Sequence, residues 1–144
     1  MAEPSRPTIS VQTKYIPASD PSLPALALRT TVLVDSYMLW IGTTEGSPED
    51  AQTAPLQGTL VRDWACAMPA PNGSPSLGPA TSLFRSSSSD IALSMAQRLA
   101  RRFGKQIFLS VDIPSSFLSM GQGRLLLDAE KGIVETLKAV ESIS

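Results

Sequence analysis

Residues 26–41 read LALRTTVLVDSYMLWI, and this stretch decides the fold. Leucine, valine, isoleucine and aromatic side chains dominate both of its halves, which is the composition of β-strands. Asp35 and Ser36 separate the halves and are typical of a turn or a bend. The stretch therefore predicts two consecutive strands, and a hairpin is one way in which they could be joined.

The second of these strands is apolar on both of its faces. Tyr37, Leu39 and Ile41 alternate along it with Met38 and Trp40. A sheet with one solvated face is expected to alternate apolar and polar residues instead. We therefore expect something to cover the second face, and a sheet from a partner chain is the interpretation that we favour. The alternative is that the chain's own proline-rich loops fold over it.

A strand expected at 58–68 has the same double apolar character. Trp64, Cys66 and Met68 share one of its faces, and small or branched apolar residues share the other. Tryptophan is more often a core residue, but it is also enriched at the centres of protein interfaces. The apolar candidates for contact with a partner are Tyr37, Met38, Trp40 and Trp64.

The period of the apolar residues predicts the other elements. A period of two indicates strands, whereas a spacing of four between 91 and 103 indicates an amphipathic helix that Gly104 is placed to end. We expect further strands at 8–15, 80–85 and 106–113 and helices at 91–103 and 123–141. The predicted fold class is α+β, with about six mostly antiparallel strands in one sheet, two helices on one face and the other face pairing with a partner sheet.

The length of the chain, 144 residues, fits a single domain that spans 1–144. Twelve prolines are present, and most of them lie before residue 80. Proline interrupts regular elements, so its clusters indicate loops. We expect 1–7 to be flexible and 43–57 and 69–79 to be mobile loops.

The composition argues against several classes of function. The net charge of −1 gives no general attraction to nucleic acid, and no apolar run is long enough to span a membrane. The absence of histidine removes the commonest general base and metal ligand, and Cys66, the single cysteine, has no such base beside it. A single cysteine also suits a reducing compartment, the cytoplasm or the nucleus. We therefore expect no enzyme, no cofactor and no metal site, and neither a nucleic acid nor a membrane as partner.

A basic cluster lies at the end of the helix expected at 91–103. Arg98, Arg101 and Arg102 are followed there by Lys105. Cations are favourable near the carboxyl end of a helix, so a solvated helix end explains them as well as a partner contact does. Both interpretations stay open, and the three arginines join the candidate interface residues.

Two segments resemble the proteasome assembly chaperone 4 family. The first is DSYMLWIG at 35–42, and the second combines TSL at 81–83, AQRLARR at 96–102 and KQIFLS at 105–110. The resemblance extends over most of 26–141, and the AQRLARR block followed by KQIF is its most specific part. The chain differs from the family pattern in its longer proline-rich N-terminus and in the loops at 43–57 and 69–79.

The resemblance implies a non-catalytic chaperone. Members of this family pair with proteasome assembly chaperone 3, and the heterodimer helps to build the alpha ring of the 20S core particle by contacting an alpha-type subunit near the fifth position. The implied location is the cytoplasm, with the nucleus as an additional site. A homodimer of the isolated chain stays open as well. The alternative function is a scaffold of the longin or roadblock type that regulates a small GTPase.

Overall fold

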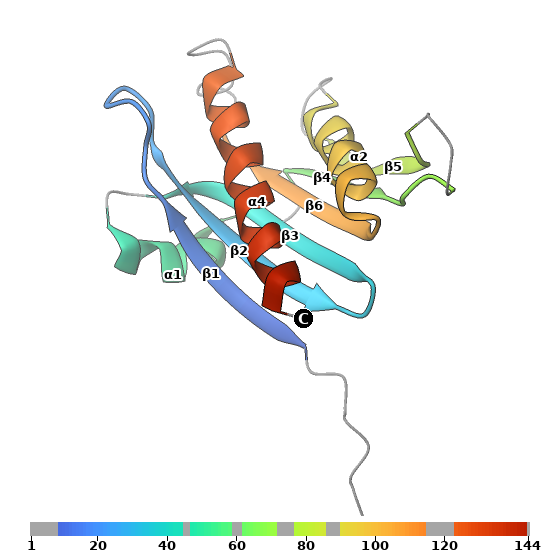
Figure 1. Cartoon of the computed structure of the whole chain (residues 1–144). Helices are drawn as coiled ribbons and strands as arrows, with labels where there is room; N and C mark the ends of the chain where they lie inside the picture. The colour runs from blue at the N-terminus through green and yellow to red at the C-terminus, as the bar shows by residue number, and fades with distance from the viewer. Residues whose placement is uncertain are drawn as a thin grey trace, which may run out of the picture.

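The computed structural model of the chain describes residues 9–44, 47–58, 62–71, 77–85, 90–114 and 123–143. Within these ranges, six strands form one sheet and three helices pack on it (Figure 1). The strands are β1 (Ser10–Ile16), β2 (Ala25–Leu33), β3 (Ser36–Thr44), β4 (Asp63–Ala67), β5 (Ala80–Arg85) and β6 (Gln106–Asp112). The helices are α1 (Pro48–Gln57), α2 (Ile91–Phe103) and α4 (Arg124–Ile143).

The strands follow the order β1-β2-β3-β6-β4-β5 across the sheet. Neighbouring strands are antiparallel except β3 and β6, which run parallel. β2 and β3 form the hairpin that was one of the predicted arrangements, and Asp35 in its turn has a positive φ of 53°. The predicted α+β class and the mostly antiparallel sheet are confirmed.

Helices α2 and α4 cover one side of the sheet, as predicted (Figure 1). The apolar face of α2 buries Met95 and Leu99, and that of α4 buries Ile133 and Leu137. The predicted end of α2 is also confirmed, because Gly104 adopts φ 64° and donates its N–H to the carbonyl oxygen of Ala100 at 2.9 Å. This side of the sheet and the two helices enclose the main hydrophobic core.

Helix α1 is the main departure from the predicted fold. The expectation of a loop over 43–57 is wrong for Pro48–Gln57, which is helical. Ser47 caps the helix by accepting the N–H of Asp50 on its side chain at 3.3 Å, and proline is well tolerated at the first helical position. The apolar positions Ala51 and Ala54 then pack on the side of the sheet opposite α2 and α4.

Some predicted segments fall outside the described residues. These are the flexible end expected at 1–7, residue 8 of the first predicted strand, and the residues 45–46 and 72–76 of the two predicted loops. The residues 59–61 at the start of the strand predicted at 58–68 also lie outside them, and β4 is the described part of that strand. Of the helices in the described ranges, none is long and apolar enough to cross a membrane.

Candidate protein interface

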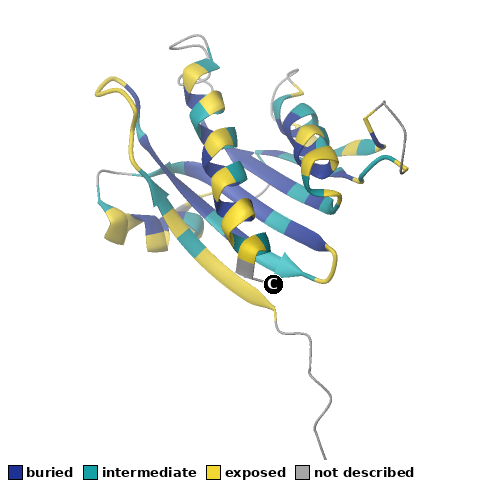
Figure 2. Cartoon of the chain, viewed as in Figure 1, coloured by how far each residue is buried: buried dark blue, intermediate teal, exposed yellow. Residues whose placement is uncertain are grey.

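The alternation of β3 divides its apolar side chains between the two sides of the sheet. Tyr37, Leu39 and Ile41 lie in the main core beneath the helices, with exposed fractions of 1%, 1% and 0%. Met38 and Trp40 face the opposite side. Figure 2 shows the buried central strands flanked by the partly and fully exposed edge strand β1. The apolar residues on the two faces of β3 thus lie in two separate environments.

The sheet register places other apolar residues beside Met38 and Trp40. Across strands β3, β6 and β4, Phe108 lies between Met38 and Cys66. In the next row of paired residues, Ser110 lies between Trp40 and Trp64. Phe84 of the edge strand β5 continues that row beside Trp64. We call the surface formed by Met38, Cys66, Trp64, Phe84 and Phe108 the open face.

The open face is incompletely buried. Phe84 is 48% exposed, and the other four side chains are half-buried. None of the five belongs to either hydrophobic cluster of the described residues. An aromatic and sulfur-containing surface of this kind is typical of the centre of a protein interface.

Helix α1 covers the neighbouring part of the same side. Trp40 is only 7% exposed, because it packs with Ala27 against Ala51 and Ala54 of α1. Gln52 of α1 also donates its side-chain N–H to the carbonyl oxygen of Thr13 at 3.3 Å. The chain therefore covers one part of the second side with its own segment, as the alternative interpretation expected, and leaves the open face beside it.

A small pocket marks the border between α1 and the open face. Its volume is about 170 Å³, and its lining comprises Arg29, Thr31, Met38, Leu39, Trp40 and Pro55. The indole nitrogens of Trp40 and Trp64 are buried, and neither has an acceptor among the described residues. This side of the sheet thus combines apolar area with hydrogen-bond donors that lack partners.

Tyr37 is separated from the other apolar candidates. Its hydroxyl donates to the Glu141 carboxylate at 2.8 Å and accepts from the Lys105 ammonium at 3.1 Å. Its ring meets Phe103 edge to face, with centroids 6.5 Å apart. Burial raises the pKa of Tyr37 above its ordinary value. The structure therefore places Tyr37 in the core and does not bring it together with Met38, Trp40 and Trp64.

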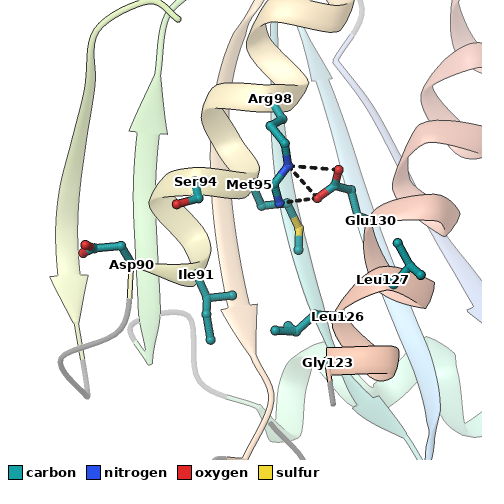
Figure 3. Close-up of a pocket in the computed structure, with 9 residues that line it drawn as sticks. All are labelled: Asp90, Ile91, Ser94, Met95, Arg98, Gly123, Leu126, Leu127 and Glu130. Carbon is teal, nitrogen blue, oxygen red and sulfur yellow. Dashed lines mark hydrogen bonds and ion pairs between the residues drawn. The ribbon is translucent and has the colours of Figure 1, made fainter. Parts of the chain in front are cut away.

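The three candidate arginines lie on α2, on the far side of the sheet from the open face. Arg98 pairs with Glu130 of α4, with its Nε 3.1 Å from a carboxylate oxygen, and this hydrogen bond raises the pKa of Arg98. The pair bridges a groove of about 470 Å³ between the two helices (Figure 3). Arg101 and Arg102 are exposed. The structure thus divides the sequence-based candidates between two surfaces.

The sequence interpretation missed four residues of the open face and its border, which are Cys66, Phe108, Phe84 and Arg29. Cys66 had a usable signal, because it shares a strand face with Trp64. Phe108 had a usable signal, because it alternates with Ile107 and Leu109 along β6. Phe84 and Arg29 had none, since their positions beside Trp64 and Trp40 depend on the pairing of the strands.

The apolar side chains of the open face suit contact with another protein. In the part of the chain that the structure describes, no group of three or more His, Cys, Asp or Glu residues could hold a metal ion. The Cys66 sulfur contacts the side-chain amide of Gln106 at 3.3 Å, which supplies no base to ionise the thiol. An apolar surface that excludes water against a partner is what these residues can form.

Two comparisons with known proteins give a match. Residues 25–113 match the family model of proteasome assembly chaperone 4. Among solved structures, the chain is similar to one from the crystal structure of a novel chaperone complex for yeast 20S proteasome assembly. The TM-score is 0.62 at 16% identity, covering 91% of this chain and 96% of that one. This likeness shows that the fold is shared. No curated protein sequence gives a significant match.

Proposed function

The chain belongs to the proteasome assembly chaperone 4 family, and on this basis we propose that it is a non-catalytic chaperone for the alpha ring of the 20S proteasome. It acts as half of a heterodimer with proteasome assembly chaperone 3, in the cytoplasm and the nucleus. The structural neighbour from a yeast 20S assembly chaperone complex supports a role inside a complex.

The open face is the observation that carries this proposal. Side chains as large as Trp64 and Phe108 remain partly solvated on the sheet, although the helix side of the same strands is closed. Burial of such apolar area is the main driving force of stable association. A second sheet stacked on this side would bury it, because sheets pack face to face about 10 Å apart.

The presence of two separate surfaces supports the chaperone role. When the open face is occupied by the partner, the helix layer remains on the outside of the heterodimer. Arg101 and Arg102 are exposed on that layer, about one helical turn beyond Arg98, which lines the groove between α2 and α4. A proteasome alpha-type subunit can then be held by the assembled pair without competing for the open face.

Co-purification from cells tests the function with a matched pair of variants. Met38→Asp places a charge on the open face, and we expect the loss of both the partner chaperone and the proteasome alpha-type subunits. Leu127→Asp places the same charge on the 66%-exposed Leu127 of α4, on the other side of the sheet, and should retain the partner. Trp40→Asp is unsuitable, because Trp40 is covered by α1 and its replacement would disturb the fold.

Two results would contradict the proposal. Recovery of small GTPases without proteasome subunits by the unmodified chain would favour the scaffold function instead. Full retention of the partner by a folded Met38→Asp variant would show that pairing does not use the open face. Thermal unfolding of each purified variant establishes that it is folded.

A further inference from the structure

Arg29 is an unusual residue for the side of the sheet that carries the open face. It lies in the middle of β2, directly beside Trp40 of β3, and its side chain is half-buried. Among the described strand residues on this side, the other charge is Asp112, which pairs with Arg62 at 2.9 Å. The Arg29 guanidinium has neither an ion pair nor a hydrogen bond within the described ranges.

The surroundings of Arg29 call for a hydrogen-bond acceptor. Arg29 lines the pocket of about 170 Å³ together with Met38, Trp40 and Pro55. The indole N–H of Trp40 is buried and also lacks an acceptor among the described residues. A carboxylate is the acceptor that matches a guanidinium best, because both oxygens can accept from its planar fork of N–H groups.

The open face of a second copy would not supply that carboxylate, because none of its five residues is acidic. A twofold dimer that stacks the two open faces would therefore bring each Arg29 against apolar residues or the other Arg29, while the exposed carboxylates of this side, Glu49 and Asp50, lie in the first turn of α1 outside that face. The carboxylate of Asp112 is already held by Arg62. Covering an unpaired guanidinium removes it from water without compensation, which is costly.

We propose that Arg29 makes the open face selective for a different chain, one whose sheet presents an aspartate or glutamate to the pocket between β2, β3 and α1. The same residue disfavours self-pairing, since it acts as a repulsive element against the homodimer and as an attractive one towards the acidic partner. This inference rests on the proposed function, because it takes the open face to be the pairing surface.

The experiment compares self-association with partner binding in the full chain. Sedimentation equilibrium measures the homodimer Kd of the isolated chain, and calorimetry measures the Kd for the partner chaperone. For Arg29→Leu we expect at least about a tenfold lower homodimer Kd and at least about a tenfold higher heterodimer Kd. Arg29→Gln, which keeps the polar character of the side chain, serves as a second variant and should shift both constants in the same directions.

Arg124→Leu is the matched control, because Arg124 is exposed at the start of α4 on the opposite side of the sheet and both constants should stay unchanged. A complementary test begins from Arg29→Glu, which should abolish pairing. Replacing each acidic residue of the partner's sheet with arginine should restore binding at one position. Failure of every such replacement would overturn the inference.

The possible results distinguish a failure of the Arg29 inference from a failure of the proposed function. If Arg29→Leu leaves both constants unchanged while Met38→Asp still abolishes pairing, the open face is the interface and Arg29 does not select the partner. A tight homodimer of the unmodified chain would also overturn the role of Arg29. If the unmodified chain binds no partner chaperone at all, the proposed function itself fails.

Discussion

The two sides of the sheet are built from the same strands, yet the described part of the chain fully buries the apolar side chains of only one side. On the helix side, Leu39 of β3 is 1% exposed and Leu109 of β6 is 0% exposed beneath α2 and α4. On the opposite side, Met38 and Phe108 of the same strands stay half-buried, although α1 covers Trp40 nearby.

The comparison shows that apolar residues in one strand serve two purposes. The helix side is filled by residues that the fold itself requires. Their burial stabilises the folded state of the single chain. The open face has the same apolar character, and under the proposed function a partner chain completes its burial. Substitutions on the two sides should therefore be distinguished by the process that they weaken, which is folding on one side and association on the other.

The largest difference is expected between Leu39→Ala and Met38→Ala. Leu39 is almost completely buried, so its truncation should lower the free energy of unfolding by about 3 kcal/mol. Met38 is half-buried, and the same truncation should cost about 1 kcal/mol or less in the isolated chain. Chemical denaturation of the purified variants measures both values, and equal losses would refute the division between the two sides.

Local patterns explain why much of the fold could be predicted. The β2–β3 hairpin and α2 depend on contacts between residues close in sequence. The spacing of the apolar residues therefore predicts both elements. Helix α1 is not predicted, because a segment that contains proline, serine and glycine is typical of a loop. Its Pro48 occupies the first turn, where a missing N–H removes no hydrogen bond within the helix.

The candidate interface was less predictable, because it depends on strand pairing over long distances in sequence. Met38 and Trp40 were identified from the double apolar pattern of β3, but the same pattern gave no basis for separating them from Tyr37. The parallel pairing of β3 with β6 then brings Phe108 beside Met38. No local signal fixes such a pairing, since the segments between the two strands contain α1, β4, β5 and α2.

An effect of intermediate size is expected on the alkylation rate of Cys66, which measures whether the open face is covered in the unmodified chain. Its thiol is half-buried in the isolated chain, so an alkylating reagent should react with it in the folded protein. With the partner at about ten times its Kd, occupancy should slow this reaction about tenfold. Mass spectrometry of the alkylated cysteine measures the two rates. An unchanged rate in a saturated complex would place Cys66 outside the interface.

The smallest effect is expected on the helix side, at the Glu141 carboxylate that holds the end of α4. Burial raises its pKa, but hydrogen bonds from Lys105 and Tyr37 lower it more, so the net direction is downward. The stability that this interaction adds is present above the ordinary pKa of a glutamate and is lost as the pH falls through the lowered value in the folded chain.

The free energy of unfolding should therefore fall less on acidification in Glu141→Gln than in the unmodified chain. The difference should be about 0.5 kcal/mol or less, since the Lys105–Glu141 pair is partly solvated. Denaturation curves of both proteins between pH 6 and pH 3 would measure the difference. The heterodimer Kd at neutral pH should not change, because Glu141 contacts Tyr37 on the closed side of the sheet. If the variant instead binds the partner more weakly and its stability in acid is unaltered, the Tyr37–Lys105–Glu141 cluster contributes to association and not to folding.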